Sequence, residues 1–163
     1  MNAANLHSTR ESLSSSVPLP DLGLDARMFD ASRFPLVRLR RRAVKPGYAF
    51  AWCAQMRRLL ALNTPFVIVA EHDADETADD IRLRTAWLRN QRVQLAAYCR
   101  GIVVIEPRIE ARATTREALR HSTEGSGVRT VVVSSMRVAS ELAPVLLKHS
   151  GEAATPVSKS RAV

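Results

Sequence analysis

Phe66-Val-Ile-Val-Ala70 is the stretch that decides the fold. It is apolar on both faces, which is typical of a central strand buried from both sides. Three further β-branched runs occur along the chain, at Phe34–Arg40, Gly101–Glu106 and Arg129–Ser134. Because helix-length amphipathic stretches separate these runs, the pattern predicts a single small α/β domain. Its sheet should have four to five strands, mostly parallel, with about four helices.

Apolar spacing and capping residues locate the expected helices. Tyr48, Trp52 and Met56 recur every four residues, which predicts that these side chains lie in the core. Thr77 is the expected N-cap of the longest helix. The expected helices span 48–62, 77–99, a stretch beginning at Thr114 in capping-box spacing with Glu117, and a last stretch running to about Lys148.

The run Phe34–Arg40 differs from the others because apolar and charged residues alternate in it. Val37 and Leu39 share one face and Arg38 lies on the other. This alternation predicts a peripheral or half-exposed strand. The residues 41–45 are expected to turn back as a short hairpin arm.

Composition and pattern also set the expected domain boundaries. We expect a disordered tail over 1–28, one domain over 29–148, and a second disordered tail over 149–163. No apolar run approaches the length of a membrane span and no secretory leader is visible, so we expect a cytoplasmic protein without membrane insertion. Cys53 and Cys99 are expected within helices as buried, reduced thiols.

The chain is strongly basic, with a formal net charge of +8, and 21 of its 24 basic residues are arginine. Residues 33–148 carry 20 basic and 11 acidic residues, so the excess belongs to the expected domain rather than to a tail. A structured surface rich in arginine suits forked contacts with carboxylates or phosphates. Nucleic acid is therefore one partner to consider.

Several arginines stand at helical spacing on two of the expected helices. The candidate anion-binding residues are Arg82, Arg89, Arg92, Arg108, Arg112 and Arg116. One interpretation is a solvated face, partly balanced by nearby glutamates. The other is binding to a nucleic-acid backbone or another polyanion. Because aromatic residues make up only 5% of the chain and no helix-turn-helix pattern is present, such binding would not read bases.

An acidic segment follows the central run, since six of the sixteen acidic residues fall within 71–80. Open α/β sheets bind ligands beyond the carboxyl ends of their strands. We therefore expect a partner protein to dock on this segment and the adjoining helix. The residues assigned to partner binding are Glu71, His72, Asp73, Asp75 and Glu76. The alternative interpretation is favourable helix-start electrostatics in a solvated loop.

Motifs for catalysis or for metal binding are not evident. Asp73, Asp75, Thr77 and Asp79 have the alternating spacing of a calcium loop, but the central glycine and the final glutamate of that motif are missing. Glycine-rich phosphate loops and nucleophile elbows are also missing. We therefore expect no metal, no cofactor and no enzymatic activity. Catalysis would require the acidic segment, His72 and a basic residue such as Arg108 to converge on one pocket.

Three stretches together resemble bacterial proteins of the STAS or SpoIIAA-like class. They are Phe29-Asp-Ala-Ser-Arg-Phe-Pro-Leu-Val, Pro65-Phe-Val-Ile-Val-Ala, and Trp87-Leu-Arg followed by Cys99-Arg-Gly-Ile-Val-Val. The resemblance spans residues 29–148. It implies a small sheet with helices and a non-enzymatic regulatory role, in which the domain docks a partner protein.

Several members of that class are switched by phosphorylation at the start of the helix after a central strand. The resemblance implies Thr77 as the equivalent position. Acidic residues surround Thr77 here, in place of the Asp-Ser-Ser/Thr-Gly pattern of phosphorylated members. The sequence thus favours a regulatory or interaction module that docks through 71–80, with backbone-only polyanion binding as the alternative, and it leaves the oligomeric state open.

Overall fold

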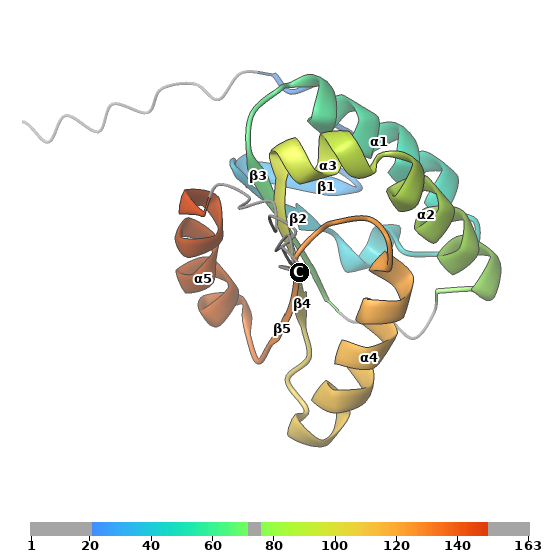
Figure 1. Cartoon of the computed structure of the whole chain (residues 1–163), viewed down its shortest axis with the longest axis vertical. Coiled ribbons are helices and arrows are strands. Elements are labelled where there is room, and N and C mark those ends of the chain that lie inside the picture. The colour runs from blue at the N-terminus through green and yellow to red at the C-terminus, as the bar shows by residue number, and fades with distance from the viewer. Residues whose placement is uncertain (1–20, 72–75, 150–163) are drawn as a thin grey trace, which may run out of the picture.

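The computed structural model describes residues 21–71 and 76–149, which form one small α/β domain (Figure 1). Its sheet has the strand order β1-β2-β3-β4-β5, with β1 antiparallel to β2 and all other neighbours parallel. The strands are β1 (Phe29–Arg33), β2 (Leu36–Leu39), β3 (Phe66–Glu71), β4 (Cys99–Ile105) and β5 (Thr130–Val133). The predicted α/β fold with a mostly parallel sheet is confirmed.

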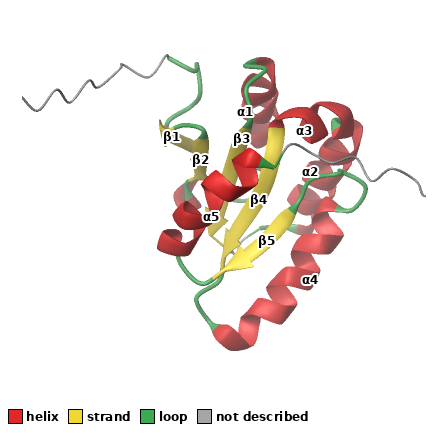
Figure 2. Cartoon of the chain, turned by 60° about the vertical axis from the view of Figure 1, so that its left-hand side comes forward, coloured by secondary structure: helices red, strands yellow, loops and turns green. Residues whose placement is uncertain are grey.

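Helices cover the two faces of the sheet unequally (Figures 1 and 2). Helices α1 to α4 pack on one face, whereas α5 alone covers the other. Within the described residues the helices are α1 (Ala49–Ala61), α2 (Ala78–Asn90), α3 (Arg92–Tyr98), α4 (Arg112–Thr123) and α5 (Met136–Lys148), with short 3-10 helices at η1 (Arg41–Ala43) and η2 (Ile109–Ala111). None of these helices has the length and apolar character needed to cross a membrane.

Strand β3 lies at the centre of the sheet, as its sequence predicts. Phe66 and Ile68 belong to the core beneath α1 to α4, and Val67 and Val69 belong to the core beneath α5. All four side chains are buried. A strand that is covered on both faces must be apolar throughout, and this requirement explains the unbroken apolar run.

Strand β2 confirms the predicted alternation, because Val37 and Leu39 are buried while Arg38 is exposed. The expected hairpin arm after β2 is wrong, since residues 41–43 form the 3-10 helix η1. The hairpin instead lies before β2, where β1 pairs with it antiparallel. Strand β1 escaped prediction because its sequence, FDASR, lacks β-branched residues and carries two charged ones. It becomes a strand through Phe29, which is buried opposite Leu39.

The single long helix expected over 77–99 is two helices, α2 and α3, separated at Gln91. The expected helix of 23 residues would extend about 35 Å, whereas a six-residue strand extends about 20 Å. An unbroken helix would therefore overshoot the amino end of β4, and the chain bends so that Leu95 is buried before β4 begins.

Both cysteines are buried and unpaired, as predicted. Cys53 lies in α1, but Cys99 is the first residue of β4 and not part of a helix. Burial raises the pKa of Cys99 to about 12 and also raises the pKa of Cys53. A thiol with a raised pKa is a weak nucleophile at neutral pH, which agrees with a packing role.

The domain includes residues that the sequence assigns to the N-terminal tail. Met28 is buried, and the Asp25 amide donates a hydrogen bond of 2.8 Å to Oε1 of Gln55 on α1. The guanidinium of Arg40 donates to the carbonyl oxygen of Ala26. The structured part therefore extends upstream of the predicted boundary at Phe29. The remaining tail residues, 1–20 and 150–163, lie outside the described residues.

The start of α4 differs from the sequence prediction, whereas the end of α5 agrees with it. Helix α4 begins at Arg112, after η2, and not at Thr114. Helix α5 ends at Lys148 as predicted, and Ser135 caps it by accepting a hydrogen bond from the Val138 amide. Pro144 is accommodated inside α5 on an exposed position.

Trp52 is the anchor of the α1–α2 contact, where its ring meets Trp87 edge to face with centroids 5.5 Å apart. Trp52→Ala should lower the free energy of unfolding by about 3–5 kcal/mol, because truncation leaves a cavity in the larger core. Urea denaturation followed by circular dichroism measures this change. Phe50→Ala on the same helix is the control, since Phe50 is 77% exposed. Similar losses for both variants would contradict this orientation of α1.

Candidate functional site

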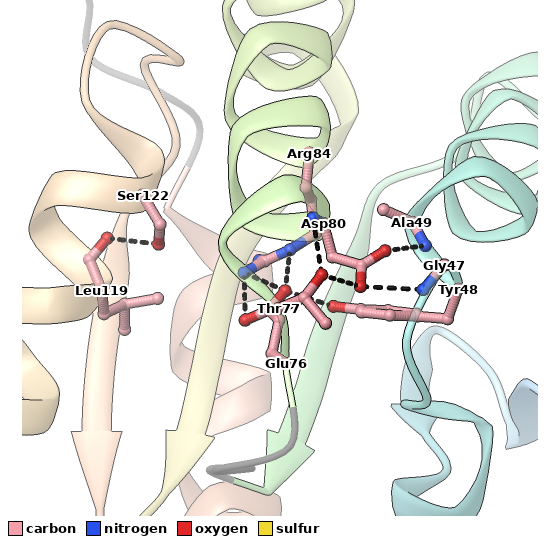
Figure 3. Close-up of polar contacts among 9 residues, drawn as sticks. All are labelled: Gly47, Tyr48, Ala49, Glu76, Thr77, Asp80, Arg84, Leu119 and Ser122. Carbon is pink, nitrogen blue, oxygen red and sulfur yellow. Dashed lines mark hydrogen bonds and ion pairs between the residues drawn. The ribbon is translucent and has the colours of Figure 1, made fainter.

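The carboxyl ends of the four parallel strands, β2 to β5, lie at one edge of the sheet, here called the carboxyl edge. Helices α1, α2, α4 and α5 all begin near this edge, because each helix precedes or follows a parallel strand and runs back toward the amino ends. The described part of the acidic segment lies here, against the start of α1 (Figure 3). This edge is therefore where the sequence and the topology both direct the search for a site.

Asp80 joins the first turns of α1 and α2 and is only 3% exposed. Its carboxylate accepts hydrogen bonds from the amides of Gly47 and Ala49, at 2.9 and 3.1 Å. Burial alone would raise the pKa of Asp80, but the hydrogen bonds from Thr77, Gly47 and Ala49 outweigh it and lower the pKa below its ordinary value of 3.8. Asp80 is thus a structural anion that serves the positive ends of two helices.

Thr77 caps α2, as predicted, and its hydroxyl makes two hydrogen bonds to Asp80. The hydroxyl oxygen accepts from the Asp80 amide at 3.1 Å, and the hydroxyl donates to Oδ2 of Asp80 at 2.5 Å. Phosphorylation at this oxygen would remove the donated hydrogen and bring a phosphate against a buried carboxylate. The geometry therefore gives Thr77 a capping role.

Glu76 is held inside the domain and does not stand on a solvated loop. The guanidinium of Arg84 donates to both of its carboxylate oxygens, at 2.8 and 2.9 Å, and the Tyr48 hydroxyl donates to Oε1 at 2.6 Å. Arg84 also lies over the ring of Trp52, 5.7 Å from its centroid. Burial raises the pKa of Tyr48, so its hydroxyl remains a donor at neutral pH.

Glu71, the last residue of β3, forms an ion pair of 2.6 Å with Arg38 on β2. Of the five residues assigned to partner binding, Glu71 and Glu76 thus have partners within the domain. The other three, His72, Asp73 and Asp75, lie outside the described residues. The residues that have the spacing of a calcium loop are described only in part. The described residues contain no cluster of His, Cys, Asp and Glu that could hold a metal ion.

A cavity of about 180 Å³ opens at the carboxyl edge, between α2 and α4 and above the ends of β3 and β4. Most of its lining is apolar and includes Ile81, Val104, Ala118 and Leu119. The ionisable side chains in the lining are Glu71, Glu76, Arg84 and Tyr48, and each of them is engaged in a hydrogen bond or ion pair described above. The wall is therefore apolar and electrostatically satisfied, and none of these groups is left free as a base.

Large apolar side chains are exposed at the same edge. Phe50 and Ile109 are each 77% exposed, and Ile81 and Leu83 are exposed to a smaller degree. Phe50 and Ile81 lie in the first turns of α1 and α2, and Leu83 lies in the second turn of α2. Ile109 lies in η2, the segment that leads into α4. Exposed apolar groups that gather in one region mark interaction surfaces more often than isolated ones do. Sequence reasoning missed them, although Phe50 lies off the apolar stripe formed by Tyr48, Trp52 and Met56.

The candidate anion-binding arginines in α4 and just before it are Arg108, Arg112 and Arg116, and two of these three make contacts within the domain. Arg108 donates through Nε and Nη2 to the carboxylate of Glu106, at 3.0 and 3.1 Å. Arg112 donates to the carbonyl oxygens of Glu106 and Pro107. Arg116 is exposed and has no hydrogen-bond or ion-pair partner in the described part of the chain.

The arginines of the α2 and α3 region show the same division. Arg82 pairs with Asp79, and Arg89 donates to the carbonyl oxygen of Glu124 at 2.9 Å. Arg92, in contrast to Arg82 and Arg89, has no such partner among residues 21–71 and 76–149. The six candidate anion-binding residues therefore form no unpaired cationic surface as a set.

Glu106 is a buried acidic residue that the sequence analysis did not single out. It directly follows β4 and is 2% exposed. Its carboxylate forms an ion pair with Arg108 and accepts a hydrogen bond of 3.5 Å from the Thr115 hydroxyl. The sequence does indicate a local ion pair here. Glu106 ends an apolar run, and two arginines, Arg108 and Arg112, follow it closely. Its contacts connect β4 to η2 and α4, so we assign it a structural role.

Comparisons with protein-family models, with curated proteins and with solved structures find no match for this chain.

Asp80→Asn should lower the free energy of unfolding by about 2 kcal/mol at neutral pH, because hydrogen bonds to a charged acceptor are replaced by weaker ones. Since the pKa is lowered in the folded state, the carboxylate stabilises the fold above pH 3.8 and this contribution disappears as the pH falls through the lowered pKa. Urea denaturation of both proteins across this pH range measures the difference.

Asp79→Asn is the matched control for that experiment, since the Asp79 side chain is 83% exposed in the same helical turn. We expect almost no change for it. A wild-type advantage over Asp80→Asn that grows as the pH falls would contradict the assigned protonation state.

Proposed function

We propose that this domain is a non-enzymatic interaction module that binds a partner protein at its carboxyl edge. The observation that carries this proposal is the exposure of Phe50, Ile81, Leu83 and Ile109 at the edge where α/β sheets bind their ligands. An apolar cavity opens at the same edge, and Ile81 is part of its lining. A protein interface needs apolar side chains that can be buried against a partner.

The state of the ionisable groups supports binding rather than catalysis. A general base must be free to accept a proton from a substrate. Glu76 instead accepts from Arg84 and Tyr48, and Asp80 accepts from two backbone amides. Glu76, Arg84 and Tyr48 line the cavity, and their fixed positions suit a preformed binding surface.

The contacts of four of the six candidate anion-binding arginines favour a protein partner over a polyanion. Binding to a phosphate backbone depends on cations that are free to replace counterions. Arg82, Arg89, Arg108 and Arg112 are each occupied by a carboxylate or a carbonyl oxygen. Docking of a partner is also what the resemblance to STAS-like proteins implies. Glu71, Glu76 and Asp80, in the described part of the acidic segment, then contribute mainly by shaping the carboxyl edge.

Affinity capture from host lysate, with and without nuclease, tests the proposal on the full chain. Ile109→Glu and Phe50→Glu should each reduce recovery of the captured protein by about tenfold or more, because a charge would be buried in the interface. Val93→Glu on α3 is the matched control, since Val93 is 76% exposed and lies away from the carboxyl edge. Circular dichroism confirms that all three variants fold.

Equal recovery with Ile109→Glu, Phe50→Glu and Val93→Glu would overturn the carboxyl edge as the docking surface. Captured material that disappears with nuclease and with rising salt would favour the polyanion alternative. Arg92→Glu and Arg116→Glu would then be the variants that weaken it.

A further inference from the structure

Among the described residues, no strand pairs with the outer side of β5. This strand is the last in the sheet order, and its four residues, Thr130-Val-Val-Val133, are β-branched and uncharged. Thr130, Val131 and Val132 are only half-buried. An unpaired edge of this composition is a template for another strand.

The directions of the β5 backbone groups follow from its pairing with β4. The Ile102 amide donates to the carbonyl oxygen of Arg129, and the Glu106 amide donates to that of Val133. In a parallel ladder every second residue faces the neighbouring strand, so Val131 also faces β4. The N–H and C=O groups of Thr130 and Val132 therefore point away from the sheet, and no hydrogen bond engages them within the described residues.

The opposite edge of the sheet is protected in a way that β5 is not. Strand β1 carries Asp30 and Arg33, and its pairing with β2 shifts register between these two residues. Charged residues and irregular pairing both discourage a further strand. The two edges thus differ in chemistry, and only β5 offers uncharged, regularly spaced backbone groups.

We propose that two copies of this chain associate through β5, which pairs antiparallel with β5 of the second copy to form one continuous sheet. The outward residues fix the register. Thr130 lies opposite Val132 of the second copy, and Val131 lies opposite its own counterpart on the two-fold axis. Each Thr130–Val132 pair exchanges two hydrogen bonds, so all outward groups of both strands are satisfied.

Charge placement allows a second copy to pair in this register. Arg129, exposed at the start of β5, lies opposite the uncharged Val133 of the second strand. The two Arg129 residues are then four positions apart along the pair, about 13 Å. This separation exceeds the screening length of about 8 Å at physiological ionic strength, so the basic chains pair without a close like-charge contact. The Val131 side chains meet on the face that α5 covers.

Sedimentation of the full chain over a wide concentration range tests the association. The wild-type protein should form a dimer as concentration rises, and added salt should preserve it. Val132→Pro removes two of the four intermolecular hydrogen bonds but none to β4, so the domain should fold and dimerise about tenfold to a hundredfold more weakly. A monomer at every concentration would overturn the proposal, as would an unchanged dimer in Val132→Pro.

Cysteine substitution tests the register independently of the proline variant. Val131→Cys should form an intermolecular disulfide on mild oxidation, because Cα atoms of a directly opposed pair on the axis lie about 4.5 Å apart. Arg129→Cys should not, since its counterpart is too distant. The native Cys53 and Cys99 are buried and do not interfere. Cross-linking of both variants, or of neither, would overturn this pairing.

Discussion

One buried carboxylate, that of Asp80, sets the relation between the two helices on which the larger core depends. It accepts hydrogen bonds from two backbone amides at the start of α1, and it also accepts one from the hydroxyl of Thr77, the N-cap of α2. A single negative charge thereby neutralises two positive helix ends that packing would otherwise bring together. Once the helices are joined at this point, Trp52 and Trp87 meet further along them.

Other charged groups at the carboxyl edge are also paired within the domain. Arg84 satisfies Glu76 while covering Trp52, and Arg108 satisfies Glu106 at the end of β4. The high arginine content of this chain therefore serves internal architecture to a large extent. Because the charged groups at this edge satisfy one another, its exposed apolar side chains are the groups with most to gain from contact with a partner.

Local patterns predicted what local physics determines. The apolar runs gave β3, β4 and β5, the four-residue spacing gave the buried stripe of α1, and Thr77 could be identified as a cap from its position alone. In each case the residues that matter are adjacent or one helical turn apart.

Non-local contacts explain what the sequence did not reveal. Strand β1 forms only because β2 is present to pair with it, and the bend at Gln91 reflects the length of a sheet that is encoded elsewhere. Asp80 could be placed in the first turn of a helix, but not against Gly47 and Ala49, more than thirty residues away. The exposed apolar residues of the candidate site escaped prediction for the same reason, since they come from three separate segments.

The unequal covering of the sheet means that the domain need not open as one unit. The core beneath α5 is the smaller of the two, and α5 alone shields it, with a proline that contributes no amide to its helix. Detachment of α5 would expose Val67, Val69 and Val103 while the packing of α1 to α4 stays intact. Hydrogen exchange should therefore divide into two levels of protection, with α5 exchanging through a lower-energy opening than α1 and β3.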